Sequence, residues 1–457
     1  MEELPQTVAE QLATFVVDTS YEELPDAVIH AARRCLLDFC GSALRGSIEP
    51  PARAARQTAA ILHPGAGASR FPDGASLTPA GAAFVNGVSS HIVELDDLHN
   101  PSTFHPAAPI IPAVLAAAEV ENASGKDVLR AIVLGYEVGI RIAEAVNPTH
   151  YRFWHPTGTC GTFGAAAGVA AILGLDVRQT ADALGSAGTQ ASGLWAFIDE
   201  GAMSKHLHPG RAAENGLTAA YMARAGFTGA HRILESPRGF VAATTDGGAA
   251  EIALRKLGAP FAIVENGFKV HACCGHTHTA VDLAIECRER LQLNDIQRLR
   301  VGTYQAAVDV AGIETPSSAY EARFSLKFAV AVGVLDGAAR ITSFTDERVH
   351  DQRVMNLIER IDVAVDGEID SRYPLEWGCR MEVEDARGEL YVSQATHPRG
   401  MPANPLSDDE LHEKYLTLAS EAIDADDASR LAQRIWLLPE GNARLFVSEL
   451  STTMAVR

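Results

Sequence analysis

Four segments of the chain place histidine, lysine and acidic side chains inside otherwise apolar sequence, where such groups can do acid/base chemistry. The first segment, HIVELDDLHNPSTFHP over residues 91–106, contains Glu94, Asp96, Asp97 and His105. A carboxylate beside an imidazole fixes its tautomer and raises its pKa, so this combination is typical of a general acid or base. Helix capping is the alternative interpretation, since Asp and Asn before a turn are ordinary N-caps.

The second and third segments add further histidines and a basic cluster. YRFWHPTGTCGTFGAAAG begins at Tyr151, a candidate substrate-binding residue, and puts His155 before a turn that opens a helix, whose free N–H groups suit a substrate carboxylate. SKHLHPGRAAENG brings together Lys205, His208 and Arg211, and such a cluster can neutralise a di- or tricarboxylate. A surface turn and a solvated helix start are the alternatives for these two segments.

The fourth segment, FKVHACCGHTHTAVDLA, surrounds two cysteines with Lys269, His276 and His278. A metal site is the rival interpretation, but the two histidines of HTH share a face only on a strand and are about 200° apart on a helix. The segment also offers no obvious carboxylate at the usual ligand spacing. We therefore predict no metal and no other cofactor, with His276 and His278 as candidate catalytic groups and Lys269 and Cys274 as candidate substrate contacts.

Composition and charge restrict the function classes open to the chain. Its 457 residues carry a formal net charge of −20, and 47% of them are hydrophobic. Such an acidic protein lacks the basic face that nucleic acid requires, and an anionic substrate would need a local basic pocket. The chain contains no apolar run of the roughly 18 to 20 residues that span a membrane. It begins MEELPQTVAEQ, which does not resemble a signal peptide. We expect a cytoplasmic protein with no membrane partner.

The seven cysteines are odd in number and scattered, with no CxxC pair. This usage predicts reduced thiols and argues against an aconitase-like iron–sulfur dehydratase.

Hydrophobic periodicity predicts which elements position these side chains. Apolar residues at helical spacing predict helices over residues 7–19, 24–44, 113–146 and 179–197. The small residues of Gly164–Gly168 allow helix backbones to approach closely.

After about Gly267 the pattern changes to alternating, β-branched segments over residues 298–312, 359–370 and 379–394, with helices between them. Ser407 and Glu410 then form a capping box that starts a final helical region. We predict a mainly α protein: a large all-helical domain built from both chain ends (1–267 and 405–457) and a smaller α/β (α+β) lid domain (268–404).

In order along the chain, HIVELDDLHNPSTFHP, HPTGTCGTFGAAAG, SKHLHPGRAAENG, KVHACCGHTH, EARFSLKFAVA and GMPANPLS resemble the MmgE/PrpD family. Its members include 2-methylcitrate dehydratase, cis-aconitate decarboxylase and iminodisuccinate epimerase. The resemblance implies a helical domain with an α/β lid, an active site in the cleft between them, and a homodimer. It also implies that the family's functional positions fall on His105, His155, Lys205, Glu94, Asp96 and Asp97.

Three departures from the family pattern bear on the reaction. Against the decarboxylase-like pattern HxxDxDDT, Glu94 replaces the first Asp and Leu98 the Thr, and His105 comes one residue late. Cys274 stands where the decarboxylase has its catalytic His. Decarboxylation is therefore the weaker alternative, whereas dehydration and epimerisation both remain open.

We predict an acid/base enzyme on a small di- or tricarboxylate, foremost a 2-methylcitrate dehydratase-like hydro-lyase. Lys205, Arg211 and helix N-termini would hold the carboxylates. His155 or His105 would remove the α-proton, oriented by Asp96 or Asp97, and a second imidazole would act as the acid. The alternatives are an epimerase of an iminodisuccinate-like amino dicarboxylate, a cis-aconitate-type decarboxylase, a non-catalytic carboxylate-binding protein, and a metal-dependent hydrolase that a chelator would inactivate. The sequence does not identify the acid.

Overall fold

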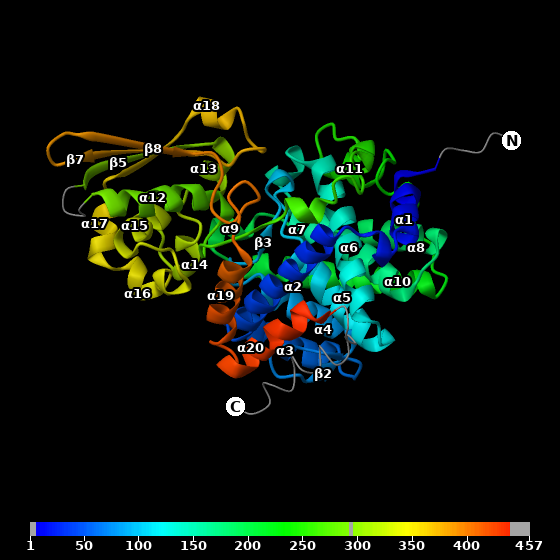
Figure 1. The fold of residues 1–457 in the computed structure, drawn as a ribbon. Helices are drawn as coiled ribbons and strands as arrows, with labels where there is room; N and C mark the ends of the chain where they lie inside the picture. The colour runs from blue at the N-terminus through cyan, green and yellow to red at the C-terminus, as the bar shows by residue number, and fades with distance from the viewer. Residues whose placement is uncertain (1–5, 292–295, 439–457) are drawn as a thin grey trace.

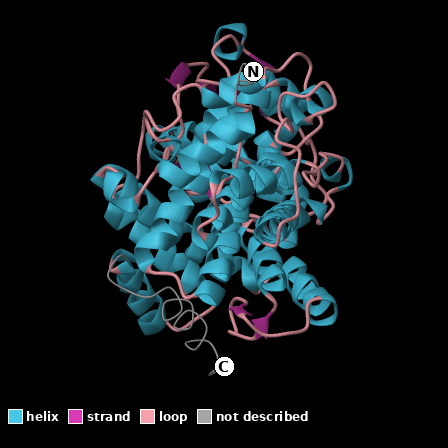
Figure 2. Ribbon diagram, turned by 90° about the vertical axis from the view of Figure 1, so that its right-hand side faces the viewer, coloured by secondary structure: helices cyan, strands magenta, loops and turns pink. Residues whose placement is uncertain are grey.

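The structure, a computed structural model, describes residues 6–291 and 296–438. Most of the chain up to residue 266 is helical, as Figure 2 shows for the side opposite the lid. The helices of this part are α1 (Val8–Asp18), α2 (Asp26–Ser47), α3 (Pro50–Leu62), α4 (Pro79–Ser90), α5 (Ala107–Glu121), α6 (Gly125–Val146), α7 (Pro156–Leu173), α8 (Val177–Gly188), α9 (Phe197–Glu200), α10 (Ser204–Arg224) and α11 (Phe240–Thr244). Two antiparallel strands of two residues each, β1 (Ala68–Ser69) and β2 (Ser76–Leu77), lie between α3 and α4.

Helix α7 forms the centre of the helical part, in contact with α5, α6, α8 and α10. Its residues from 156 to 170 are all buried, because its small side chains leave no polar face to turn toward water. At Gly164 an added Cβ would lie 2.7 Å from Ile110 Cδ1 and 2.8 Å from the carbonyl oxygen of Gly135. The close approach that the small residues predicted is therefore confirmed.

Two predicted helices differ from the observed ones. The segment 113–146 forms α5 and α6, because Asn122 ends α5 in the left-handed conformation and Ser124 begins α6 as an N-cap. The segment 179–197 is helical only to Gly188 in α8, and turns and a loop follow it before α9.

The lid contains a four-stranded sheet in the order β6-β5-β7-β8. Strands β5 and β6 are parallel, whereas β5–β7 and β7–β8 are antiparallel, with Val301 opposite both Val363 and Met381. The strands are β5 (Ile296–Thr303), β6 (Ile361–Val365), β7 (Cys379–Asp385) and β8 (Leu390–Ala395). The sequence predicted strand as far as residue 312, but helix α13 follows β5 after Tyr304, so that part of the prediction is wrong.

Helices cover one side of this sheet, as Figure 1 shows for α12 and α15 beneath the strands. The inward residues of β7 alternate with polar ones, which is the pattern of a sheet with one solvated face. The helices of this part are α12 (His278–Arg290), α13 (Gln305–Ala311), α14 (Ala319–Ala322), α15 (Leu326–Asp336), α16 (Asp346–Val349), α17 (Gln352–Ile358) and α18 (Gly367–Asp370).

The chain then returns to the helical part through α19 (Asp408–Ala419) and α20 (Ala425–Trp436), which both contact α2. The capping box of Ser407 and Glu410 is confirmed at the start of α19. The fold class, mainly α with a small α/β part, is confirmed as well.

Of the three hydrophobic cores among the described residues, two lie in the helical part, one of them formed by residues from 52–223, and the third lies in the lid. The other core of the helical part uses residues from 8–268 and 406–438, and the core of the lid uses residues from 272–401 together with the loop 93–98 and Leu418. The domain limits stay a prediction, and 1–5, 292–295 and 439–457 lie outside the described residues.

All seven cysteines are buried free thiols. None of the described helices has the length and apolar character to cross a bilayer.

We predict that Gly164→Ala destabilises the protein by about 1–3 kcal/mol, because the new methyl group would overlap the backbone of α6. That loss outweighs the gain of about 1 kcal/mol in helix propensity. Urea denaturation measures the change, with Gly367→Ala as the control, since nothing lies within 4 Å of a Cβ at Gly367. A Gly164→Ala protein as stable as the wild type would contradict this account of the packing.

Candidate active site

The acidic loop between α4 and α5 connects the helical part to the lid. Val93 and Leu95 belong to the hydrophobic core of the lid, whereas Glu94 and Asp96 form ion pairs with buried basic side chains. The loop then pairs with the chain entering the lid, through β3 (Asp97–Leu98) and β4 (Gly267–Phe268).

Glu94 is held between two buried lysines. One carboxylate oxygen forms an ion pair with Lys205, and the other lies 2.8 Å from Lys269 Nζ. Burial disfavours the charged forms of both Glu94 and Lys269, but their opposite charges outweigh it. The two ammonium groups hold the pKa of Glu94 well below its ordinary value, and the carboxylates of Glu94 and Asp96 raise the pKa of Lys269. Glu94 has a φ of 57°, which is strained for a residue other than glycine.

Asp96 lies between two histidines. Its carboxylate accepts a hydrogen bond from His91 Nδ1 at 2.6 Å and lies 3.3 Å from His105 Nδ1. His105 Nδ1 also hydrogen-bonds the backbone carbonyl of Asp97 at 2.7 Å. Burial lowers the pKa of His91 to about 4. Burial would raise the pKa of Asp96, but the neighbouring imidazoles of His91 and His105 outweigh this effect and hold that pKa well below its ordinary value. The cluster therefore contains an ionised Asp96 beside a neutral His91.

His155 caps the N-terminus of α7 and lies next to the Asp96 cluster. Its ring is 5.4 Å from the ring of His91 and 6.4 Å from that of His105, measured between centroids. His155 Nδ1 is 3.1 Å from His208 Nδ1, so its Nε2 is the nitrogen left for a substrate. Burial, followed by the neighbouring His208, lowers the pKa of His155 well below its ordinary value.

The lid contributes a second hydrogen-bonded group. His276 Nε2 is 3.1 Å from the hydroxyl of Tyr151 in the helical part, and His276 Nδ1 is 2.8 Å from the hydroxyl of Tyr304 in the lid. The ring of Trp377 stacks on His276 at 4.2 Å. Cys274 is buried nearby, and burial raises the pKa of its thiol.

These groups enclose a small space, which we call the inner cavity. From the helical part it is lined by Glu94, Leu98, Thr103, His105, Tyr151, His155, Trp195 and Lys205. The lid lines the other side with Cys274, Gly275, His276, Phe324 and Trp377. Its volume of about 20 Å³ has room for roughly one water molecule, so a carboxylic acid enters only if side chains or the lid move.

Several predicted site residues do not line the inner cavity. Lys269 and His208 reach it only through Glu94 and His155. His278 is buried beside His271 in the lid, with Nε2 3.3 Å from the carbonyl oxygen of Cys273. Arg211 has a half-exposed side chain and forms an ion pair with Glu214.

Asp97 is occupied by structural contacts. Its carboxyl accepts hydrogen bonds from the first amide of α5 at Ala107 (3.0 Å), the hydroxyl of Tyr136 (2.7 Å) and the amide of Asn266 (2.8 Å). Burial raises the pKa of this carboxyl well above its ordinary value. Asp97 thus contributes its backbone carbonyl to His105, and Asp96 is the carboxylate that faces the imidazoles.

The aromatic side chains around the inner cavity were not among the residues predicted from the sequence. Trp195, Phe324 and Trp377 line the inner cavity, and Tyr304 lies behind His276. No spacing pattern could have identified these four residues, because each lies in a turn or loop outside the helices and strands.

Two groups of described residues have ligand atoms close enough to hold a metal ion: His91 with Asp96 and His105 in the site, and His99 with Glu144 and Glu265 outside it. In the first group both Nδ1 atoms already hydrogen-bond to oxygen. The predicted absence of a metal stays a prediction.

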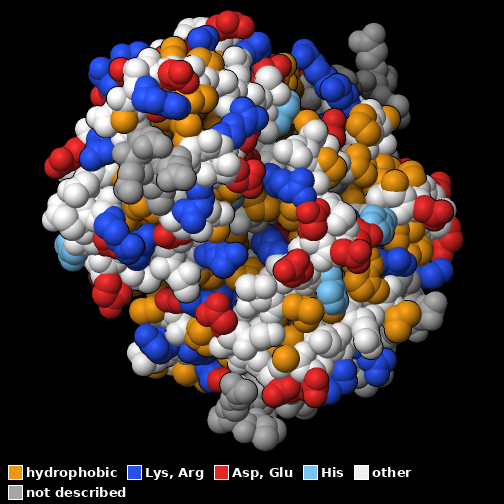
Figure 3. Space-filling model, turned by 60° about the vertical axis from the view of Figure 1, so that its left-hand side comes forward, with side chains coloured by type: hydrophobic (Ala, Val, Ile, Leu, Met, Phe, Trp, Pro, Cys, Tyr) orange, Lys and Arg blue, Asp and Glu red, His pale blue; other side chains and the backbone are white. Residues whose placement is uncertain are grey.

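The surface adds little attraction for an anion. On the face shown in Figure 3, Lys and Arg side chains are interspersed with Asp and Glu.

We predict that Glu94→Gln destabilises the protein by about 3–5 kcal/mol, because it leaves two buried ammonium groups without their carboxylate. The measurement is urea denaturation at neutral pH. The control is Glu314→Gln, which removes an exposed carboxylate that pairs with Lys327 and should leave stability near that of wild type. A loss below about 1 kcal/mol for Glu94→Gln would contradict the pairing.

We also predict that stability falls as the pH drops from about 6.5 toward 4. Burial lowers the pKa values of His91 to about 4 and of His99 and His276 to about 3, so these side chains charge only when the protein unfolds. These histidines contribute fully to the free energy of unfolding at a pH above the pKa that they have in the unfolded chain. The contribution is lost as the pH falls through their lower pKa in the folded protein. Between its unfolded and folded pKa values, each histidine adds about 1.4 kcal/mol per pH unit to the slope of the free energy of unfolding against pH. In urea melts from pH 7.5 to pH 5, His99→Gln should reduce the slope by one such increment, and an unchanged slope would refute the assignment.

Comparisons with known proteins identify the family of the chain. The MmgE/PrpD N-terminal domain matches residues 10–253, and the MmgE/PrpD C-terminal domain matches residues 271–438. The chain is 30% identical to the cis-aconitate decarboxylase-like protein oryM of Aspergillus oryzae, over 94% of both chains. It is 28% identical to a cis-aconitate decarboxylase of Aspergillus terreus, over 91% of this chain and 90% of that one. Identity to the mitochondrial 2-methylcitrate dehydratase of Yarrowia lipolytica is 23%, over 80% and 73%.

Proposed function

This chain belongs to the MmgE/PrpD family, and from that premise we propose that it is an acid/base lyase that removes a proton from a carbon next to a carboxylate. The substrate is a small di- or tricarboxylate, and the reaction we favour is the loss of water. The relatives are named as decarboxylases and a dehydratase, which supports an enzyme of this kind.

The observation that carries this proposal is the hydrogen bond between His105 and the backbone of Asp97. A carbonyl oxygen can only accept, so His105 Nδ1 carries the hydrogen of that 2.7 Å contact. The neutral ring then has its lone pair on Nε2. Because His105 lines the inner cavity, we assign Nε2 as the base that takes the α-proton, and the carboxylate of Asp96 stabilises the resulting imidazolium.

The second proton-bearing group lies on the lid side. His276 joins the hydroxyls of Tyr151 and Tyr304, and both His276 and Tyr151 line the inner cavity. A proton can pass along this chain to a departing hydroxyl group. We assign the acid to this pair, with Cys274 beside it.

Lys205 is the group that meets the substrate carboxylate. An ammonium has three donors, and the ion pair with Glu94 uses one of them. The remaining donors can stabilise the negative charge that develops when the α-proton leaves. Lys269 supports this arrangement by sharing the charge of Glu94.

In the dehydration, His105 Nε2 takes the proton from the carbon next to the carboxylate, and the C–H electron pair forms the new C=C bond. The C–O bond at the neighbouring carbon breaks, and the lid-side acid protonates the hydroxyl, which leaves as water. The products are an unsaturated acid and one water molecule.

Decarboxylation is the second candidate, and the names of the relatives at 28–30% identity favour it. In that reaction a C–C bond breaks to release carbon dioxide, and an acid group then protonates carbon. The sequence resemblance places Cys274 where the decarboxylase pattern has a histidine, and this argues against decarboxylation. The homodimer, the absence of a metal and the cytoplasmic location stay predictions.

The test is proton NMR in deuterium oxide with a panel of citrate, 2-methylcitrate, cis-aconitate, malate derivatives and iminodisuccinate. A dehydratase converts a hydroxy acid to an unsaturated acid and incorporates deuterium in the reverse reaction. A decarboxylase releases carbon dioxide, and an epimerase incorporates deuterium with inversion and no loss of water. No deuterium and no product with any of these acids would refute the proposal.

We predict that His105→Ala lowers kcat by about two to four decades, because it removes the base. The control is His350→Ala, an exposed histidine far from the inner cavity in the lid, which should keep wild-type turnover. If His105→Ala retained near-wild-type turnover while His155→Ala did not, the base would be His155 instead.

A further inference from the structure

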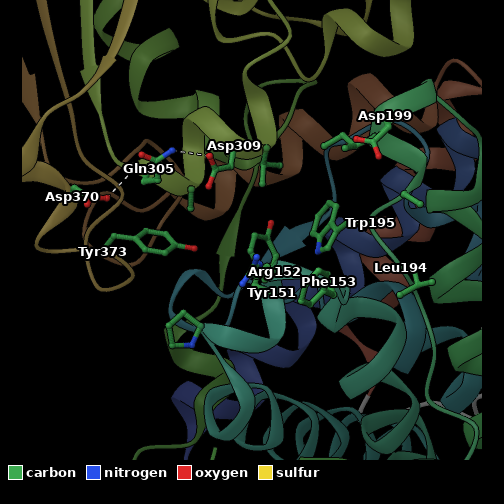
Figure 4. Close-up of a pocket in the computed structure, with 15 residues that line it drawn as sticks. Tyr151, Arg152, Phe153, Leu194, Trp195, Asp199, Gln305, Asp309, Asp370 and Tyr373 are labelled. Atoms are coloured by element: carbon green, nitrogen blue, oxygen red, sulfur yellow. Dashed lines mark hydrogen bonds between the residues drawn. The ribbon is translucent and has the colours of Figure 1, made fainter. Parts of the chain in front are cut away.

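A large cleft opens directly outside the inner cavity, and we call it the outer cleft. Its volume is about 770 Å³, within the usual range for a ligand site. Tyr151 and Trp195 line both the outer cleft and the inner cavity, so the two spaces meet at these side chains. Figure 4 shows Tyr373 pointing across the cleft from the lid toward Tyr151 and Arg152.

The walls of the outer cleft are mostly apolar. The helical side contributes Phe153, Leu194, Trp195 and Ile198, and the lid contributes Val310 and the ring of Tyr373. The side chains of Phe153 and Leu194 are 56% and 53% exposed. Apolar side chains left open beside a site of buried charges are typical of a surface that a ligand covers.

The polar groups of the outer cleft disfavour a further carboxylate. Asp199, Asp309 and Asp370 lie on its rim with one cation, Arg152. Gln305 hydrogen-bonds Asp309 through its side chain at 2.7 Å and Asp370 through its backbone at 2.8 Å. The two lid carboxylates are therefore held in place on the rim, where they repel an anion.

We propose that the outer cleft binds a hydrocarbon substituent of several carbons on the same acid whose carboxylates lie in the inner cavity. The substrate is then an alkyl-substituted di- or tricarboxylate. Its carboxylates meet Lys205, and its chain passes Tyr151 and Trp195 to lie between Leu194 and Val310. This inference rests on the proposed function, because it takes the inner cavity as the carboxylate site.

The experiment measures the dissociation constants of succinate and its 2-methyl, 2-butyl and 2-octyl derivatives by calorimetry. These acids lack a leaving hydroxyl, so binding is read without turnover. Each added methylene that becomes buried should lower Kd about three- to fourfold, until the cleft is filled.

The variants are the double substitution Leu194→Ser with Val310→Ser, and Ile61→Ser as the control. Ile61 is 77% exposed on α3, away from the cleft. The double variant should lose most of the gain with chain length and bind succinate within about twofold of wild type, whereas the control should behave as wild type.

Three results would overturn the inference. The first is a Kd that does not change with chain length in the wild type. The second is a chain-length effect that the double variant retains. The third is tighter binding of a 2-(aminoalkyl)succinate than of the alkyl compound of equal length, because the rim carboxylates would then select a cation.

The outcome is separable from that of the proposed function. Deuterium incorporation without a chain-length effect would refute the cleft and leave the acid/base chemistry standing. A chain-length effect without deuterium incorporation into any acid of the panel, or into the 2-alkylmalate of the chain length that binds best, would support the cleft and refute the chemistry.

Discussion

The charge balance around Glu94 is the interaction on which the rest of the site depends. The three groups come from the acidic loop, from α10 and from the segment after β4, so one buried carboxylate brings together parts of the chain about 65 to 175 residues apart. A buried charge without a partner is among the most costly features a fold can have. The positive φ of Glu94 persists because both of its oxygens are bound to lysines.

The three acidic residues of this loop make different contacts. Glu94 forms ion pairs with the two buried lysines, Asp96 faces the imidazoles, and Asp97 accepts a hydrogen bond from the first amide of α5. The backbone bends through this loop, with Glu94 at a φ of 57°, and this irregular path lets three acids within four residues meet three different environments. His91 remains neutral because burial outweighs the pull of Asp96 on its pKa.

Much of the fold could be predicted from the sequence, because helical periodicity and strand alternation depend on neighbouring residues. The helical bulk, the return of the C-terminal helices and the capping box at Ser407 all follow from local patterns. The helix after Tyr304 was missed, because GTYQAAVDVAG alternates like a strand while its burial is set by packing in the lid. Within the site, His105, His155, Lys205 and Glu94 do lie together, and their segments carried a detectable mixture of histidine and charge.

Other parts of the site could not be predicted, for a physical reason. Whether Asp97 or Asp96 faces the histidines depends on the direction of a single peptide segment, which composition does not encode. The exposure of Arg211 and the burial of His278 depend on the faces that α10 and α12 turn toward their neighbours. The link from Tyr151 to His276 joins two residues 125 positions apart, on opposite sides of the boundary between the helical part and the lid.

The short pairing of β3 with β4 has a mechanical consequence. It attaches the loop that carries the site's acids to the strand through which the chain enters the lid. Asp97, which belongs to that pairing, also supplies the backbone carbonyl oxygen that accepts the hydrogen bond from His105 Nδ1. A rotation of the lid about this strand would therefore pull on the same peptide whose carbonyl oxygen holds His105, the base of the proposed mechanism.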